Sequence, residues 1–324
     1  MANLVYLLLL HCLSLVVGYA PTISAAGIAR ILIYSATRGF RHDSIPTAID
    51  ALKARGTTID AEFVSTEDPS QFMDTILSGF DAIVFLSTTG EVLDSAGKTA
   101  FQNYLNHGGN FVGIHSASDT LVNTTCYTSE LGAVFDYHPE LQNFTVDVLG
   151  PPHPSTSMLP DAWTVSDEAY NFKSDPRALG SVVVLSADES TYVDTGVRKF
   201  DQGKPHPTAW YQEKGAGIQE GGIAGRSFYT SLGHLNETWQ DHLFLSHVLG
   251  AISWVLQANT TLAFNSTAQV GNQATNSTPP AASTQPSNSQ SQSTASSASQ
   301  MAIAVGTIAL ALLGQRIAKI IKDL

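Results

Sequence analysis

Apolar segments alternate with helix-forming segments through the first 115 residues, and this alternation constrains the fold more than any other feature. Residues 29–36 (ARILIYSA) and 81–88 (DAIVFLST) are almost continuously apolar, which is typical of strands buried on both faces. A third strand is predicted at 61–65, and a fourth apolar run ends at His115. Strands and helices at this spacing form parallel sheets with right-handed crossovers. The predicted helices between the strands are 43–55, capped by Asp43 or Ser44 with Pro46 in the first turn, 69–78, and 95–107.

The second half of the chain is richer in predicted strands. These are residues 144–148, 181–186, 208–212 and 226–232. An amphipathic helix over residues 239–256 follows them. We therefore predict one α/β domain over residues 27–263, flavodoxin-like, with a doubly wound and mostly parallel sheet.

The N-terminal end of the chain has the composition of a targeting segment. Residues 1–26 contain the apolar run LVYLLLLHCLSLVV and end in small residues that suit signal-peptidase cleavage, so we predict a signal peptide. No basic residue precedes the apolar run, and a transmembrane anchor is the alternative. Removal of this segment also removes Cys12, which leaves Cys126 alone and excludes an internal disulfide.

Six Asn-x-Ser/Thr sequons predict N-linked glycans and passage through the secretory pathway. Together with the predicted signal peptide they indicate an extracellular protein on the cell surface. The sequons begin at Asn123, Asn143, Asn236, Asn259, Asn265 and Asn276.

The C-terminal end combines a polar spacer with an apolar tail. Residues 264–300 are rich in Ser, Thr, Asn, Gln, Ala and Pro and carry no charge, so we predict a disordered stalk. The tail, 301–324, begins with an apolar run and ends in GQRIAKIIKDL. This order is typical of a GPI-anchor signal, with attachment between Ser289 and Ser297. A single transmembrane helix with the basic residues on the cytoplasmic side and a freely secreted form are the alternatives.

The charge of the chain limits its partners. The formal net charge is −12, and no cluster of Lys or Arg interrupts the acidic balance. Since nucleic-acid binding requires basic residues that displace counterions from phosphates, nucleic acid is excluded as a partner. Contact with a membrane is expected only through the C-terminal anchor.

Polar side chains follow three of the predicted parallel strands. Residues 37–42 (TRGFRH) follow the first strand, 88–91 (TTGE) the third, and 115–119 (HSASD) the fourth. Because the carboxyl ends of parallel strands meet at one edge of a sheet, we expect these loops to converge. The fourth strand ends on His115, where α/β enzymes often hold a reactive side chain on a sharp strand-to-helix turn.

Six motifs in one order along the chain carry a family resemblance. They are GFRHDS (39–44), GGNFVGIHSASDT (108–120), DYHPE (136–140), DEAYNF (167–172), HPTAW (206–210), and GRSFYTSLGH (225–234) with Trp239 downstream. The set resembles the ThuA-like, or trehalose-utilisation, family over residues 31–256. The resemblance implies a class I glutamine amidotransferase-like fold and a link to disaccharide catabolism, with a poorly defined activity.

The residue at the strand end argues against amidotransferase chemistry. A glutaminase needs a thiolate at this turn, activated by a nearby base, to attack the amide of glutamine. Here the position holds His115, and Cys126 falls in a Thr-rich segment that we expect to be a loop, beside the sequon at Asn123. We therefore predict that the chain is not a glutaminase.

The histidines and carboxylates of these loops predict an acid–base site. If the protein is an enzyme, we expect His115 to act as general base or metal ligand, with His234 as its partner. Glu168 and Asp119 would orient groups or transfer protons. The resemblance implies a small-molecule carbohydrate or keto-sugar as substrate, and a lyase, isomerase or hydrolase reaction. The residues expected to bind it are Arg41, His42, Glu91, Ser116, His138 and Tyr170.

The same imidazoles are candidate ligands for a divalent metal such as zinc. His42, His115 and His234 are the candidates, although no HxxxH or HExxH spacing is present. The sequence establishes no cofactor. Three functions stay open: an enzyme that transforms a sugar, a non-catalytic sugar-binding module at the cell surface, and a metal-dependent hydrolase.

Other aromatic and histidine residues have two interpretations. Tyr170 and Phe172 could form a sugar platform with Glu168, or they could pack inward. The pair His206 and Trp210 fits a structural turn equally well. Three further histidines are expected at the surface or packed against a helix: His153, His242 and His247.

Overall fold

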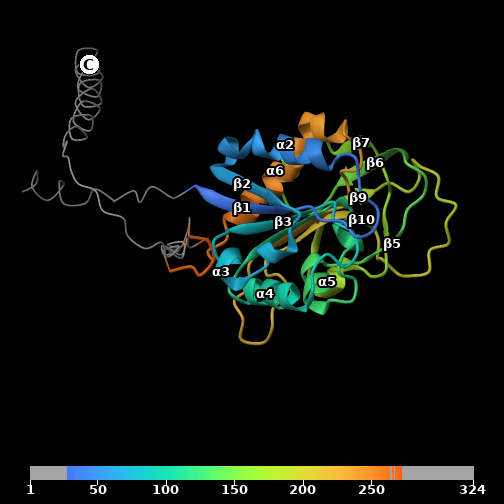
Figure 1. The fold of residues 1–324 in the computed structure, drawn as a ribbon. Helices are drawn as coiled ribbons and strands as arrows, with labels where there is room; N and C mark the ends of the chain where they lie inside the picture. The colour runs from blue at the N-terminus through green and yellow to red at the C-terminus, as the bar shows by residue number, and fades with distance from the viewer. Residues whose placement is uncertain (1–27, 263–264, 266, 272–324) are drawn as a thin grey trace, which may run out of the picture. The chain divides into compact units, whose positions relative to one another are not determined.

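The computed structural model describes residues 28–262, 265 and 267–271 (Figure 1). The predicted signal peptide (1–26) and hydrophobic tail (301–324) lie outside the described residues, as does most of the predicted stalk (264–300). Within the described part of the chain, no helix combines the length and the apolar character needed to cross a membrane.

A nine-stranded sheet forms the centre of the domain. Five adjacent strands run parallel in the order β2 (Ala61–Thr66), β1 (Ala29–Tyr34), β3 (Ala82–Leu86), β4 (Asn110–Ile114) and β11 (Ser227–Thr230). The sheet continues through antiparallel pairs with β10 (His206–Gln212), β9 (Val182–Ala187), β6 (Gln142–Val148) and β7 (Ala162–Asp167). A small second sheet pairs β5 (Phe135–Tyr137) with β8 (Asn171–Phe172).

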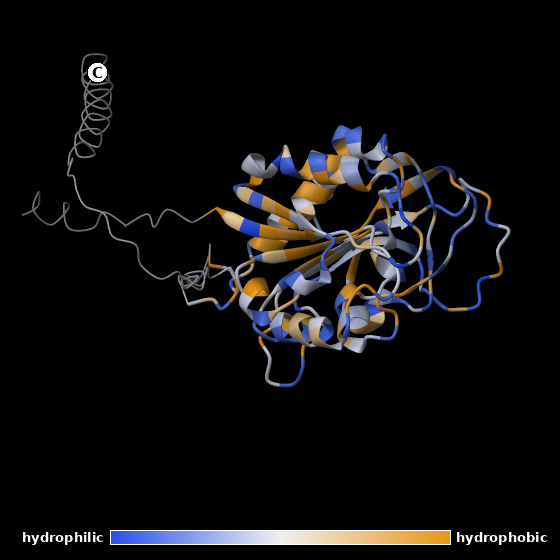
Figure 2. Ribbon diagram, in the orientation of Figure 1, coloured by the Kyte–Doolittle hydropathy of each residue, from blue (hydrophilic) through white to orange (hydrophobic). Residues whose placement is uncertain are grey.

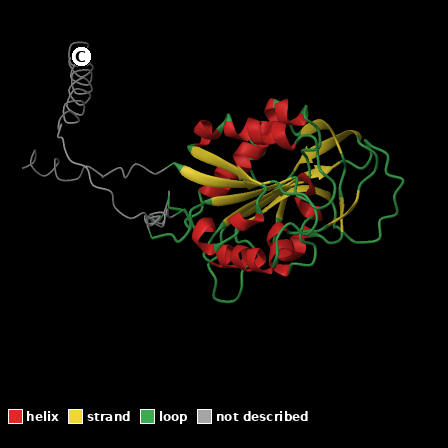
Figure 3. Ribbon diagram, in the orientation of Figure 1, coloured by secondary structure: helices red, strands yellow, loops and turns green. Residues whose placement is uncertain are grey.

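Helices cover both faces of the central sheet (Figures 1 and 3). One face carries α2 (Ile45–Lys53) and α6 (His242–Leu256), and the other carries α3 (Asp74–Leu77), α4 (Ser95–Asn106) and α5 (Thr125–Leu131). Two apolar clusters lie on these two faces, which explains why the central strands are apolar on both sides (Figure 2). The predicted single α/β domain with a doubly wound, mostly parallel central sheet is confirmed.

Side-chain caps fix where several helices begin. Asp94 Oδ1 accepts a 2.8 Å hydrogen bond from the Gly97 N–H at the start of α4, and Asp241 Oδ1 accepts one of 2.8 Å at the start of α6. Ser44 precedes α2 as predicted, but its hydroxyl donates to the Gly233 carbonyl (3.4 Å) and does not cap the helix. This bond ties the start of α2 to the loop after β11.

The predicted continuous helix over residues 69–78 is wrong. The segment forms a 3₁₀ turn, η2 (Pro69–Gln71), and then the short helix α3. Between them Met73 is extended, with φ −130° and ψ 144°, and the ring of Phe72 packs 4.6 Å from that of Tyr34. Burial of this aromatic side chain outweighs the local helix preference.

The predicted loop around Cys126 is also wrong, because this residue lies on α5. A start rich in threonine gives the segment low intrinsic helix propensity. Contacts with the rest of the domain stabilise the helix. Its residue Tyr127 is fully buried and packs 5.0 Å from the ring of Phe85. Its hydroxyl also donates to the Ala117 carbonyl at 2.8 Å.

Two of the three further histidines are buried. His153 is 5% exposed, and its ring stacks on Tyr211 at 4.6 Å and lies 4.9 Å from that of Trp254 on α6, so of the two predicted positions it takes the one packed against a helix. His247 lies on the buried side of α6, and its Nδ1–H donates to the Ser155 carbonyl at 2.9 Å. His242, at the start of α6, is exposed.

The sequons differ in their accessibility. Asn123, Asn143 and Asn259 are exposed, whereas Asn236 and Asn265 are half-buried. Asn276 lies outside the described residues. Glycosylation at these positions stays a prediction.

Candidate functional site

The turn that follows β4 holds His115 in an unusual backbone conformation. Its φ of +55° lies in the left-handed region, which costs free energy for a residue with a side chain and is often found at functional sites. The residue begins the 3₁₀ turn η3 (His115–Asp119) and is fully buried. Its carbonyl accepts a 2.8 Å hydrogen bond from the Tyr229 hydroxyl, which fixes the turn against β11.

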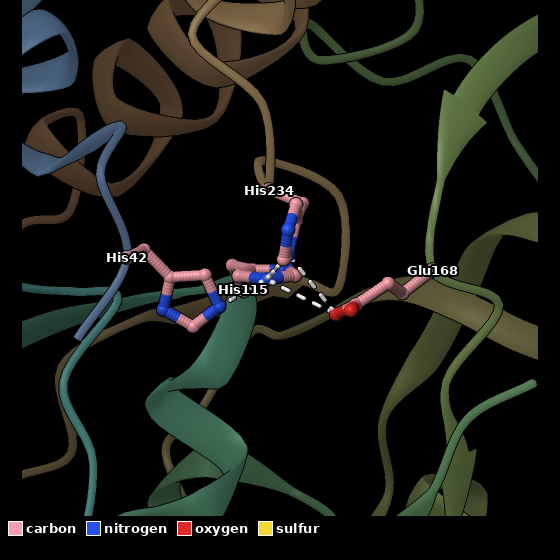
Figure 4. Close-up of side chains that lie close together, drawn as sticks. All are labelled: His42, His115, Glu168 and His234. Carbon is pink, nitrogen blue, oxygen red and sulfur yellow. Dashed lines mark hydrogen bonds and ion pairs between the residues drawn. The ribbon is translucent and has the colours of Figure 1, made fainter. Parts of the chain in front are cut away.

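Four side chains from separate segments converge beside this turn (Figure 4). His42 comes from the loop after β1, Glu168 from the segment after β7, and His234 from the loop after β11. Their ligand atoms and that of His115 all lie within 4.8 Å of one another. We call these four residues the histidine–glutamate cluster.

His115 Nε2 lies at the centre of the histidine–glutamate cluster. It is 3.0 Å from His42 Nε2, 3.3 Å from His234 Nδ1 and 3.6 Å from Glu168 Oε2. On the far side of its ring, Nδ1 lies 2.6 Å from the Ser231 carbonyl oxygen. Since a carbonyl only accepts, Nδ1 of the neutral ring carries the proton and Nε2 presents a lone pair to the cluster.

Two of the three imidazoles are held in the neutral form. Burial lowers the pKa of His115 well below its ordinary value, and the neighbouring His42 lowers it further. Burial also lowers the pKa of His42 to about 4, with the neighbouring His234 adding to the effect. Both rings are therefore neutral at neutral pH and available as lone-pair donors.

Glu168 and His234 form the charged pair of the cluster. Glu168 Oε2 lies 3.1 Å from His234 Nδ1, and this hydrogen bond raises the pKa of His234. Burial opposes ionisation of Glu168, but the hydrogen bond from His234 and the nearby His138 outweigh it and lower the pKa of the carboxyl group. The cluster thus contains one carboxylate and one imidazole that readily takes a proton.

Asp167 positions two members of the cluster, although it was not predicted as a site residue. Its Oδ2 accepts hydrogen bonds from the backbone N–H groups of Gly233 (2.8 Å) and His234 (3.3 Å), and its Oδ1 accepts one from Glu168 (2.8 Å). The side chain is 1% exposed, and burial raises its pKa to about 6. Asp167 ends β7 and begins the DEAYNF motif, and the alternating pattern of β7 places it on the inward side of the strand. This pattern was the available signal.

Tyr170, His138 and Ser116 border the cluster. The Tyr170 hydroxyl lies 3.1 Å from His115 Nε2, and its ring stacks 5.6 Å from that of His138. Both Tyr170 and Phe172 are buried, so they pack inward and do not form an exposed platform. Ser116 Oγ lies 3.4 Å from His42 Nδ1. The side chains of His234 and His138 are 20% and 35% exposed and mark the side that opens to solvent.

The remaining predicted residues lie on the surface near the same edge. Arg41 pairs with Glu67 at 2.7 Å, and Glu91 pairs with Lys98 at 2.6 Å. Asp119 is exposed. Within the described chain, none of Arg41, Glu91 and Asp119 forms a hydrogen bond or an ion pair with the cluster, and their roles stay predictions.

The fold and the turn define a class of protein. This is an α/β domain with a mostly parallel central sheet in which a histidine stands at the turn that follows β4. The family model for ThuA, described as trehalose utilisation, matches residues 30–255. The chain belongs to this family.

Solved structures support the same fold. A ThuA-like protein from Bacteroides uniformis matches with a TM-score of 0.55 and 22% identity, over 76% of this chain and 99% of that chain. A ThuA-like protein from Parabacteroides merdae matches with a TM-score of 0.53 and 16% identity, over 71% and 90%. No curated protein matches the chain.

Proposed function

We propose that the chain binds a carbohydrate or an oxidised sugar at the histidine–glutamate cluster and acts on it with a divalent metal. The observation that carries this proposal is the convergence of four ligand atoms from four separate loops within 4.8 Å. The description of the family as trehalose utilisation favours a disaccharide or a derivative of one as the substrate.

The donor set of the cluster fits a metal ion. Zinc–nitrogen bonds of about 2.0–2.1 Å place the ligands of a tetrahedral site about 3.3 Å apart. The contacts of His115 Nε2 with His42 Nε2 and His234 Nδ1, at 3.0 and 3.3 Å, lie close to this separation, as does the 3.1 Å contact between His234 and Glu168. The bond from His115 Nδ1 to a carbonyl is the outer contact that metal-binding histidines usually make. A bound ion would polarise a sugar carbonyl or activate a water molecule.

A metal-free acid–base site is the second candidate. It is favoured by the 3.1 Å contact between His234 and Glu168, in which the imidazole takes a proton readily and the carboxylate stays ionised. In this form His234 would supply a proton to a sugar oxygen, and Glu168 would orient the ring that supplies it. His115 Nε2 would then serve as the base.

Metal analysis of the purified full-length chain separates these candidates. We expect about one equivalent of zinc or a similar ion, lost in His115→Ala and kept in the control His242→Ala, which changes an exposed histidine. Trehalose and its singly oxidised keto derivative are then tested for binding and turnover. Turnover without metal supports the acid–base candidate, and binding without turnover supports a non-catalytic module. A chain that takes up no metal and neither binds nor converts these sugars contradicts the proposal.

We further propose that the protein acts at the cell surface. The predicted signal peptide, the six sequons and the hydrophobic tail support this location. In the described part of the chain, Asn123, Asn143 and Asn259 are accessible to a glycan. Release from intact cells by a phosphatidylinositol-specific phospholipase is expected for a lipid anchor. Retention on the cells after that treatment would indicate a transmembrane helix.

A further inference from the structure

Phe40 stands exposed beside the histidine–glutamate cluster. Its side chain is 66% exposed, more than that of any other Phe, Tyr or Trp in the described part of the chain. The ring lies 4.8 Å from that of His42, edge to face, and His42 Nε2 in turn lies 3.0 Å from His115 Nε2. His42 is therefore the only residue in this chain of contacts between Phe40 and His115, the centre of the proposed site.

The backbone that carries Phe40 is fixed by Thr89. The Thr89 hydroxyl donates to the Phe40 carbonyl at 2.8 Å and accepts the Gly39 N–H at 3.1 Å. The Thr89 carbonyl accepts the Arg38 N–H at 2.7 Å. Single exposed apolar residues are common on protein surfaces, so exposure alone says little. Here the exposed ring stands on a backbone that three hydrogen bonds fix beside the histidine–glutamate cluster, and this placement suggests a specific role in binding.

The far side of the cluster offers polar groups. His138 is 35% exposed on its side chain, and its Nε2 lies 3.5 Å from Glu168 Oε1. Glu168 Oε2 faces the cluster, so the second oxygen is turned toward the rim. A ligand over the cluster would thus meet an aromatic face near His42 and hydrogen-bonding groups near Glu168.

We propose that Phe40 is the platform on which a pyranose ring stacks through its C–H face. The face of an aromatic ring is electron-rich and attracts the polarised C–H groups of a sugar. The oxygen-bearing edge of the pyranose would then reach the cluster, and its outer hydroxyl groups would reach Glu168 and His138. This inference rests on the proposed function and narrows its substrate class to sugars with a flat apolar face.

Calorimetric titration of the metal-loaded full-length protein tests the inference, with trehalose and its singly oxidised keto derivative as probes. Phe40→Ala is expected to weaken binding about tenfold, the effect of losing one aromatic contact. Phe40→Tyr keeps the aromatic face and is expected to bind like the wild type. Phe40→Leu keeps apolar area without a π face and should fall between. Ile223→Ala, which truncates a 52% exposed side chain beside His107 at the amino end of the sheet, is the matched control.

The outcomes separate this inference from the function on which it rests. Binding by the wild type together with unchanged affinity in Phe40→Ala would overturn the platform and leave the proposed function standing. Absence of binding by the wild type to either sugar would overturn both. Metal content and thermal midpoint are measured for each variant, and equal values in Phe40→Ala and the wild type show that a loss of affinity is not a loss of structure.

Discussion

Replacing Glu130 with glutamine is expected to change how the stability of the domain depends on pH. Glu130 lies on α5 and is 1% exposed. Its Oε2 accepts the Gly217 N–H at 2.9 Å, while its Oε1 has no hydrogen-bond partner within the described residues. Burial raises the pKa of this carboxyl group to about 8. The folded protein therefore keeps Glu130 protonated at neutral pH, whereas the unfolded chain ionises it.

The magnitude follows from the difference in pKa between the two states. When folding raises the pKa of an acid, its contribution to stability is fully present at pH values below its pKa in the unfolded chain, here 4.5. That contribution is lost as the pH rises toward the folded-state pKa of about 8. Each pH unit in this window costs about 1.4 kcal/mol. Between about pH 5 and about pH 7.5 the wild type should lose about 3 kcal/mol through Glu130 alone. Glutamine has the same shape and does not titrate, so Glu130→Gln should lose none of it.

Urea unfolding of the wild type and Glu130→Gln at these two pH values measures the effect. The quantity to compare is the difference between the two proteins, because buried histidines titrate in the same window and cancel in it. Glu220→Gln, which changes an exposed acid in the loop between β10 and β11 that contains Gly217, is the control and should parallel the wild type. Equal pH slopes for the wild type and Glu130→Gln would refute the assignment of a protonated carboxyl at this position.

Three further predictions test the site and the fold. Asp167→Asn should lower metal affinity about 10- to 100-fold in a competition assay with a metal indicator, because an amide cannot accept the backbone N–H groups of both loops that carry ligands. Burial lowers the pKa of His153 and His247 to about 4. The contribution of each neutral histidine to the free energy of unfolding is therefore fully present above pH 6.5 and is lost as the pH falls toward 4. Replacing either histidine with glutamine should recover about 2 kcal/mol of this loss at about pH 5 in urea unfolding. Gly132→Ala should lower the free energy of unfolding by about 3 kcal/mol, since φ is +105° and an added Cβ would collide with the Trp210 indole.

The parts of the fold that local pattern specifies were predictable. Apolar runs buried on both faces identified β1 and β3 to within about two residues at each end, and they identified where β4 ends. The helix α5 was missed because its stability comes from the burial of Tyr127 against β3, β4 and α4 and not from its own threonine-rich sequence. Tertiary contacts of this kind leave no local signal.

The site was predictable in its location and only partly in its members. The rule that parallel strands end at one edge predicted that the loops of His42 and His115 converge, and both side chains lie in the cluster. His234 was expected as the partner of His115 without that rule, and it also lies in the cluster. The same rule says nothing about which way a side chain points, and Arg41 turns to Glu67 on the surface although it is adjacent to His42. Asp167 acts through backbone N–H groups of a distant loop, and such a contact exists only once the chain is folded.

At the strand-to-helix turn of this domain, His115 presents a single lone pair to the cluster, and this limits the roles that the residue can have in catalysis. His115 Nδ1 is committed to the Ser231 carbonyl, so only Nε2 faces the cluster. A metal bound at Nε2 would use the lone pair that a general base needs, and the two roles exclude each other. With metal present, the remaining acid–base groups are those at the rim, Glu168 through its Oε1 and the neighbouring His138. The metal content of the protein therefore decides whether proton transfer occurs at the buried centre of the cluster or at its solvent-facing edge.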